Sequence, residues 1–209
     1  VMGYAPFCGR HFHVEPGVLI PRPETQQLVE LAVEEMGKNA ARSVLDIGTG
    51  SGCIAISIAL EAPQSEVNAW DISTDALRIA RDNATSLHAA VDFRQQDALH
   101  APMEDREKWD LIISNPPYVM EKERREMADN VLRHEPSLAL FVPNDDPLRF
   151  YRAIARYGKH ALQPGGTLLF EINPLLAEDM VRLLEEESYQ HVQLIADAFG
   201  KSRFTKATI

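Results

Sequence analysis

The chain has 209 residues, of which 45% are hydrophobic and 25% charged, and its formal net charge at pH 7 is −10. This length suits one large domain or two small ones, and the composition is that of a globular protein with an ordinary core. The acidic balance disfavours recognition of long stretches of nucleic-acid backbone, because such binding depends on Lys and Arg side chains that neutralise phosphates.

Cellular location and metal content follow from what the sequence lacks. It has no apolar run of the ~18–20 residues that a membrane-spanning helix needs, and no signal-peptide pattern at its start. Its two cysteines, Cys8 and Cys53, match neither a disulfide framework nor a metal site, and the seven histidines show no ligand spacing. We therefore expect a cytoplasmic protein without a metal ion and without contact with a membrane.

The amino-terminal part predicts a small separate element. Strand-forming residues on both sides of a glycine turn in 4–14 indicate a short β-hairpin, and two prolines then fix an extended stretch. A helix follows in which apolar residues recur at three- and four-residue steps up to Met36, and we expect Thr25 to cap it. We divide the chain into a hairpin with a proline-fixed linker, 1–24, and a main domain, 25–209.

Strands and helices alternate from residue 43 onwards. The expected strands are 43–47, 67–70, 91–94, 109–113, 167–172, 191–195 and 203–208, and the expected helices are 53–60, 75–87, 146–162 and 173–184, with Asp75 capping the second and Pro164-Gly165-Gly166 stopping the third. This alternation predicts an α/β fold with a doubly wound, mostly parallel sheet. Only 196–201 separate the last two strands, so we expect a hairpin there and an antiparallel edge strand. Ligands of such sheets bind at the carboxyl ends of the strands.

A glycine loop, Asp46-Ile47-Gly48-Thr49-Gly50-Ser51-Gly52, follows the first strand of this sheet and opens a helix. Glycines let a backbone come close to a ligand, and a helix amino end offers free N–H groups. The spacing G-x-G-x-G differs from the G-x-G-x-x-G of a dinucleotide site. We assign residues 48–52, that is Gly48, Thr49, Gly50, Ser51 and Gly52, to cofactor binding; the alternative is a plain structural turn.

Two acidic residues end later strands of the same sheet. The carboxylate of Asp71 is placed to accept hydrogen bonds from both ribose hydroxyls of a nucleoside, and Asp97 or the Ala98 backbone to meet an adenine amino group. The alternative for either aspartate is a turn or cap residue. Taken in order, the loop and these acids resemble motifs I to III of the class I methyltransferases. The resemblance implies a Rossmann-like fold and S-adenosyl-L-methionine as the cofactor, with S-adenosyl-L-homocysteine as the product.

The motif Asn115-Pro116-Pro117-Tyr118 directly follows the fourth strand, and we assign its four residues to catalysis and Asn115 to cofactor binding as well. Proline has no N–H and a fixed φ, so the pair is rigid and the Pro116 carbonyl stays out of any ladder. That carbonyl and the Asn115 side-chain oxygen are two fixed acceptors, which match the two N–H bonds of a planar –NH2 group. We predict that Tyr118 packs on the planar target; the alternative is a Pro-Pro turn that merely ends a strand.

The chemistry of an amide nitrogen explains this arrangement. Its lone pair is delocalised, so acceptors that hold both N–H bonds must orient it toward the methyl group. They also stabilise positive charge that arrives on the nitrogen. The motif indicates the type of nitrogen but leaves open a glutamine amide and an exocyclic base amine such as adenine N6.

The chain resembles the catalytic domain of the peptide-chain release factor glutamine N5-methyltransferases over almost all of its length. The segments that carry the resemblance are Leu19-Ile20-Pro21-Arg22-Pro23-Glu24-Thr25, 46–52, 115–118, His134-Glu135-Pro136-Ser137-Leu138-Ala139-Leu140, Phe170-Glu171-Ile172 and Asp197-Ala198-Phe199-Gly200-Lys201-Ser202-Arg203. This resemblance implies methylation of the side-chain amide N5 of the glutamine in the Gly-Gly-Gln motif of bacterial class 1 release factors. It also implies an amino-terminal helical domain that this sequence does not include.

The resemblance further implies a substrate-pocket wall, whose members are Pro21, Arg22, Pro23, Glu24 and Glu135. The alternatives are an ion pair between Arg22 and Glu24 that only braces the segment, and a structural turn at Glu135. The sequence departs from the family pattern at Gln26, where the family usually has Glu, and at Asn173, where it usually has Gly.

Three other functions stay open. An adenine-N6 DNA or rRNA methyltransferase would use the same motif but predicts a basic groove. A ribosomal-protein glutamine methyltransferase would use the same chemistry. A non-catalytic cofactor-binding module usually loses the glycine loop or the Asn-Pro-Pro-Tyr motif, and both are intact. We expect a monomer that acts on a class 1 release factor without direct contact with nucleic acid.

Overall fold

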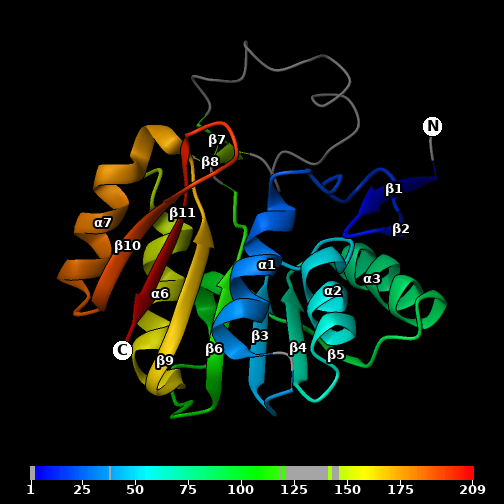
Figure 1. The fold of residues 1–209 in the computed structure, drawn as a ribbon, viewed down its shortest axis with the longest axis horizontal. Coiled ribbons are helices and arrows are strands. Elements are labelled where there is room, and N and C mark those ends of the chain that lie inside the picture. Colours follow the sequence, from blue (N-terminus) through cyan, green and yellow to red (C-terminus); the bar gives the residue numbers. More distant parts are fainter. Residues whose placement is uncertain (1–2, 38, 118, 121–140, 143–145) are drawn as a thin grey trace.

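The computed structural model describes residues 3–37, 39–117, 119–120, 141–142 and 146–209. Its centre is a seven-stranded sheet in the order β10-β11-β9-β6-β3-β4-β5 (Figure 1). The strands are β3 (Ser43–Ile47), β4 (Glu66–Asp71), β5 (Val91–Gln95), β6 (Trp109–Ser114), β9 (Leu162–Glu171), β10 (Gln190–Ala196) and β11 (Ser202–Thr208). The helices are α1 (Thr25–Met36), α2 (Cys53–Glu61), α3 (Thr74–Ser86), α6 (Arg149–Ala161) and α7 (Ala177–Glu186), with 3-10 turns η1 (Ala98–His100) and η3 (Pro174–Leu176).

The sheet separates two hydrophobic cores. Successive residues of a strand point to opposite faces, so Val44 joins the core under α1 and α2 while Leu45 joins the core under α6 and α7. Both side chains have no solvent exposure. The two cores explain why the central strands are hydrophobic at nearly every position, as strands covered on both faces are.

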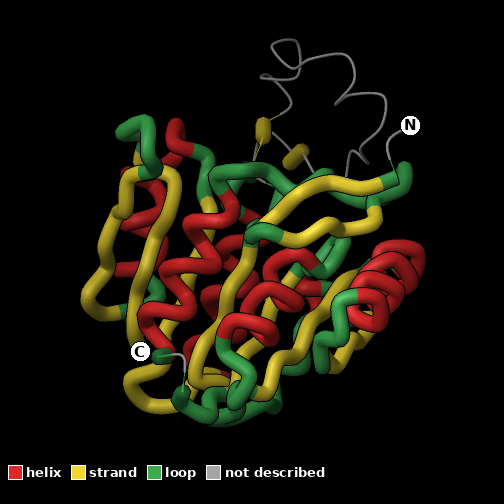
Figure 2. Tube along the Cα trace, turned by 45° about the vertical axis from the view of Figure 1, so that its right-hand side comes forward, coloured by secondary structure: helices red, strands yellow, loops and turns green. Residues whose placement is uncertain are grey.

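The predicted fold class is confirmed. β3, β4, β5, β6 and β9 pair in parallel, and the carboxy-terminal strand β11 runs antiparallel to β9 and β10. The predicted hairpin is formed by β1 (Tyr4–Phe7) and β2 (Arg10–His13), and Figure 2 shows it as a separate pair of strands beside the helices. The division of the chain after residue 24 stays a prediction.

Four details of the sequence prediction are wrong. The antiparallel strand β11 lies inside the sheet, and the edge strand is β10, which runs in the same direction as β9. Pro164-Gly165-Gly166 lies within β9, in a bulge, instead of in a loop after the helix. Ser73, not Asp75, caps α3, with its Oγ accepting the Ala76 N–H at 3.1 Å. Thr25 is the first residue of α1 and is not its cap.

Two elements were not predicted. β7 (Val119–Met120) and β8 (Phe141–Val142) form a short parallel pair. Within the part of the chain that the structure describes, no helix combines the length and the hydrophobicity needed to cross a membrane.

Candidate active site

A cavity of about 340 Å³ opens at the carboxyl ends of β3, β4, β5 and β6. Parallel strands end at the same edge of a sheet, so segments that are far apart in the sequence meet there. Of the residues predicted to bind cofactor or act in catalysis, those that line the cavity are Gly48, Gly50, Asp71, Asp97, Ala98, Asn115, Pro116 and Pro117.

The other predicted site residues lie elsewhere. Thr49, Ser51 and Gly52 belong to the same loop but are buried and do not line the cavity. The segment Pro21-Arg22-Pro23-Glu24 does not line it either; the cavity is reached by Gly17, Val18 and Leu19, a few residues earlier. Tyr118 and Glu135 lie outside the described residues. The roles of all these residues stay predictions.

Backbone hydrogen bonds hold the glycine loop against β4. The N–H groups of Gly48 and Thr49 both donate to the Trp70 carbonyl, at 2.9 and 3.0 Å, and the Gly50 N–H donates to Asp71 Oδ2 at 2.9 Å. A Cβ at Gly50 would meet nothing within 4 Å, whereas one at Gly52 would meet Ile56 Cδ1 at 2.9 Å. Gly50 therefore leaves the cavity open, and Gly52 allows α2 and α3 to pack closely.

Asp71 connects the loop with the start of α3. Its Oδ1 accepts the Ser73 N–H at 2.9 Å and its Oδ2 accepts the Gly50 N–H. Burial raises the pKa of Asp71 above its ordinary value, while the N–H bonds from Ser73 and Gly50 act in the opposite direction. Each carboxylate oxygen has two lone pairs, so one on each oxygen remains for a ligand hydroxyl.

Asp97 lines the cavity, as predicted, and is also a cap residue, which was the alternative interpretation of the sequence. It is the N-cap of η1, with Oδ1 accepting the Leu99 N–H and Oδ2 paired with His100 Nδ1, both at 2.9 Å. Burial acts to raise the pKa of Asp97, but the bonds from His100 and Leu99 outweigh it and lower the pKa. The residue caps a turn and still lines the cavity beside Ala98.

Asn115 stands at the end of the central strand β6. The preceding Ser114 donates its hydroxyl to the Ile47 carbonyl at 2.6 Å, which ties the ends of β6 and β3 together. The Asn115 side-chain oxygen is shielded from solvent and has no hydrogen-bond partner among the residues that the structure describes. A buried acceptor without a donor costs free energy, so this oxygen is suited to a donor that a ligand brings into the cavity.

Comparisons with known proteins agree with this geometry. Residues 12–138 match the family model described as "Methyltransferase small domain". A release factor glutamine methyltransferase from Bacteroides thetaiotaomicron is 56% identical over 207 residues, 99% of this chain and 74% of the relative. One from Neisseria gonorrhoeae is 39% identical, over 98% of this chain and 74% of the relative. The chain belongs to the release factor glutamine methyltransferase family.

Solved structures of more distant proteins share the fold. The 16S rRNA N2 G1207 methyltransferase of Thermus thermophilus aligns with a TM-score of 0.68 at 22% identity, covering 98% of this chain and 49% of that one. A methyltransferase from Pyrococcus furiosus aligns with a TM-score of 0.67 at 16% identity, over 96% and 89% of the two chains. At these identities the likeness supports the fold alone.

Some cavity residues of this family member were missed from the sequence. Val18, which is 2% exposed, enters from the segment after the hairpin, and Arg149 and Phe150 enter from the first turn of α6. The Arg149 guanidinium carbon lies 5.4 Å from the centre of the Phe150 ring. None of these residues belongs to a motif; the one available signal was that α6 begins at the same edge of the sheet as the glycine loop.

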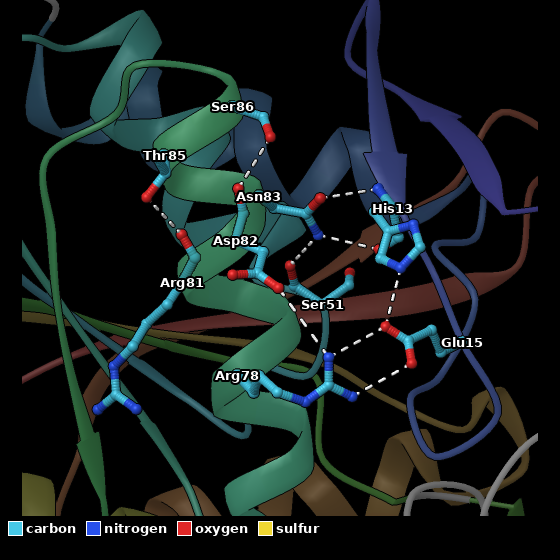
Figure 3. Close-up of polar contacts among 9 residues, drawn as sticks. All are labelled: His13, Glu15, Ser51, Arg78, Arg81, Asp82, Asn83, Thr85 and Ser86. Carbon is cyan, nitrogen blue, oxygen red and sulfur yellow. Dashed lines mark hydrogen bonds and ion pairs between the residues drawn. The ribbon is translucent and has the colours of Figure 1, made fainter.

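The hairpin is attached to the glycine loop through Asn83 of α3 (Figure 3). Its Nδ2 donates to the Ser51 carbonyl at 2.9 Å and to the His13 carbonyl at 3.0 Å, and its Oδ1 accepts the His13 N–H at 2.7 Å. Asn83 is 2% exposed. One side chain therefore fixes the spacing between the cofactor loop and the chain that leads to Val18.

We expect Asn83→Ala to weaken cofactor binding about tenfold. Without this side chain the glycine loop and the hairpin are less ordered, and the entropy lost when the cofactor orders them reduces the binding free energy. The substitution should also lower the free energy of unfolding by about 2–4 kcal/mol, since buried backbone groups lose their partners. Calorimetric titration and denaturant unfolding measure the two effects. Arg78→Ala is the matched control: its ion pair with Glu15 joins the same helix and hairpin at an exposed position, without touching the loop. Lower stability with unchanged cofactor affinity would show that Asn83 serves the fold alone.

Asp46, the first residue of the glycine motif, is a buried carboxyl group below the cavity. Both carboxyl oxygens are shielded from solvent, as is the nearby Thr49 hydroxyl. Burial raises the pKa of Asp46 from 3.8 to about 7; Thr49 opposes this shift and the Asp71 carboxylate adds to it. Between these two pH values the folded protein holds a proton that the unfolded chain has released, so stability falls as the pH rises through this window.

Asp46→Asn removes this titration. We expect it to stabilise the cofactor-free protein more at pH 8 than at pH 5, by on the order of 2 kcal/mol. Urea unfolding at the two pH values measures the difference. An effect of the same size at both would mean that the Asp46 carboxyl does not titrate in this range.

Proposed function

We propose that this protein transfers the methyl group of S-adenosylmethionine to the side-chain amide N5 of the Gly-Gly-Gln glutamine in a class 1 release factor. The observation that carries the proposal is the shielded Asn115 oxygen at the end of β6, which has no partner within the described part of the chain and lies beside a cavity that the glycine loop and Asp71 also line. The relatives named release factor glutamine methyltransferase support the choice of substrate, because they match nearly the whole chain.

The cavity residues fit the cofactor. Gly48 and Gly50 leave open backbone, the remaining lone pairs of Asp71 suit two ribose hydroxyls, and Ala98 lies where an adenine edge would meet backbone. When bound, S-adenosylmethionine supplies an electrophilic methyl group. The cofactor would therefore occupy the β3, β4 and β5 side of the cavity.

Asn115 and Pro116 act on the target nitrogen. The Asn115 oxygen and the Pro116 carbonyl accept the two N–H bonds of the amide, which localises the nitrogen lone pair and orients it. Transfer would break the bond between the methyl carbon and the cofactor sulfur, which leaves as a neutral thioether, as the bond to nitrogen forms. The two acceptors would stabilise the positive charge that passes to the nitrogen. One of its protons then leaves to solvent, so no strong base is needed.

A methyl-transfer assay tests the proposal. The protein, labelled S-adenosylmethionine and a purified class 1 release factor should give label on the Gly-Gly-Gln glutamine, located by mass spectrometry, and none when that glutamine is replaced by alanine. Parallel reactions contain ribosomal proteins, rRNA and DNA. Label in one of these alone would replace the proposal with a ribosomal-protein or base methyltransferase, and cofactor binding without any transfer would indicate a non-catalytic module.

We also propose that the protein acts as a monomer in the cytoplasm and makes no direct contact with nucleic acid. The net charge of −10 supports the absence of nucleic-acid contact, since it opposes phosphate binding. Light scattering on the purified protein would test the monomeric state, and titration with RNA would test the absence of nucleic-acid contact.

A further inference from the structure

Two large hydrophobic side chains stand out among the described residues by their exposure. Phe199, in the loop between β10 and β11, is 90% exposed, and Leu175, in η3 directly after β9, is 68% exposed. An exposed aromatic side chain gains nothing from the fold, because its burial energy is realised only when something covers it. The apolar surface of both side chains is therefore available to a partner.

The loop that carries Phe199 is well fixed. The Asp197 carboxylate accepts the N–H groups of Phe199 and Lys201 at 2.9 and 3.1 Å, and Arg203 Nε at 2.9 Å. The side chain of Asp197 is only 4% exposed. Burial acts to raise the pKa of Asp197, but the bonds from Arg203, Lys201 and Phe199 lower it, so the carboxylate stays charged at neutral pH.

A second attachment joins this loop to the start of α1. Gln27 Nε2 donates to the Ala196 carbonyl at 2.9 Å, and the Gly200 N–H donates to the Asp197 carbonyl at 3.0 Å. The fold thus presents Phe199 on an ordered loop, which reduces the entropy that a partner must remove on binding.

The loop lies at the end of the sheet where the catalytic motif also lies, that is, at the carboxyl ends of the parallel strands. β9 is the neighbour of β6, and β11 is the neighbour of β9, with Ser114 opposite Phe170 and Phe204 opposite Glu171. Neighbouring strands are ~4.8 Å apart, so the start of β11 lies roughly 10 Å from the end of β6. Figure 1 shows the β10–β11 loop at the edge where β9 and β6 end.

Leu175 extends from the same place. The Ile172 N–H donates to the Arg203 carbonyl at 2.7 Å, which joins the end of β9 to the start of β11. Leu175 lies in η3, three residues after Ile172, and is therefore close to this junction. Since the cofactor side of the cavity lies toward β3, β4 and β5, both exposed side chains are on the opposite side of Asn115, where a target can approach.

We propose that Phe199 and Leu175 form a docking surface for the protein substrate, and that they contact apolar groups of the polypeptide next to the methylated glutamine. This inference rests on the proposed function and deepens it. A nucleic-acid partner fits less well, because the nearby Arg203 is paired with Asp197 and the chain is strongly acidic. Truncation of a well-covered aromatic anchor in a protein interface typically weakens binding tenfold or more.

The test compares Phe199→Ala, Leu175→Ala and the unaltered protein with a class 1 release factor as substrate. We expect KM for the release factor to rise about tenfold for Phe199→Ala and about threefold for Leu175→Ala. The kcat at saturating substrate and the cofactor Kd should stay within about twofold, because neither side chain lines the cavity. Phe199→Leu keeps an apolar side chain and should recover part of the loss.

Met103→Ala is the matched control. Met103 is 50% exposed and lies in the segment that leads to the start of β6, whereas the docking surface adjoins the other end of that strand, so the KM of this variant for the release factor should not change. An unchanged KM in Phe199→Ala, with methylation of the release factor intact, overturns the docking surface and leaves the proposed function standing. If the unaltered protein does not methylate the release factor, the proposed function fails first. If Phe199→Ala instead impairs methyl transfer to RNA, the surface recognises a nucleic-acid substrate and the inference is wrong.

Discussion

Asn115→Ala should lower kcat by about a thousandfold or more, because it removes one of two acceptors that act on charge developing in the transition state. Cofactor affinity should change by less than about threefold, since in the proposed binding mode the glycine loop and Asp71 hold the cofactor independently of this side chain. Single-turnover methylation of a release factor measures the first quantity, and calorimetric titration with S-adenosylmethionine measures the second. The variant should fold, because the Asn115 oxygen has no hydrogen bond to any described residue that the substitution would break.

Asn115→Asp separates acceptance of a hydrogen bond from simple packing. The carboxylate keeps an acceptor oxygen at nearly the same position, so this variant should retain more activity than Asn115→Ala. The Ser114 hydroxyl still ties β6 to β3 in both variants, which keeps the strand end in place. Turnover of Asn115→Ala near that of the unaltered protein would show that the Asn115 oxygen does not act on the target nitrogen.

The sequence was sufficient to predict the sheet and the end of its strands at which the candidate site lies, and particular residues show why. Strands such as Ser43–Ile47 are covered on both faces and read as short apolar runs, and glycine or proline bounds most of them. The residues at their carboxyl ends, Asp71, Asp97 and Asn115, converge because parallel strands end together. The parallel topology thus brings motifs that are separate in the sequence together at one cavity.

Local patterns were insufficient where distant contacts decided the structure. Thr25 is typical of a helix cap, yet its hydroxyl donates to Glu171 Oε1 at 2.6 Å, in a buried contact with the end of β9. Similarly, Pro164-Gly165-Gly166 suggests a loop, but a bulge accommodates it in β9. The position of β11 between β9 and β10 also depends on pairing that a linear pattern does not encode.

The missed cavity residues share one cause. Val18 and Phe150 are apolar side chains that would suit a core, and only the placement of their segments brings them to the cavity. Conversely, Ser51 and Gly52 belong to a recognised motif but do not line the cavity: the Ser51 carbonyl accepts a hydrogen bond from Asn83, and Gly52 allows close contact with Ala80. A motif therefore predicts the loop better than it predicts which of its residues line the cavity.

Asp71→Ala is expected to raise the cofactor Kd about a hundredfold, because two hydrogen bonds to a charged acceptor contribute roughly 1.5–3 kcal/mol each. The Gly50 N–H would also lose its acceptor, which loosens the loop that must meet the ligand. Once cofactor is saturating, kcat should fall far less than in Asn115→Ala, since Asp71 is remote in function from the target nitrogen. Calorimetric titration and methylation at graded cofactor concentrations measure both quantities.

Asp75→Ala is the control for this variant. It removes a carboxylate from the first turn of the same helix α3, at an exposed position that does not line the cavity. Its cofactor Kd should stay within about twofold, since an exposed charge at this distance is screened by solvent and salt. Asp71→Asn keeps one acceptor oxygen and should lie between the unaltered protein and Asp71→Ala. Equal loss of affinity in Asp71→Ala and Asp75→Ala would mean that general electrostatics, and not ribose recognition by Asp71, determines cofactor binding.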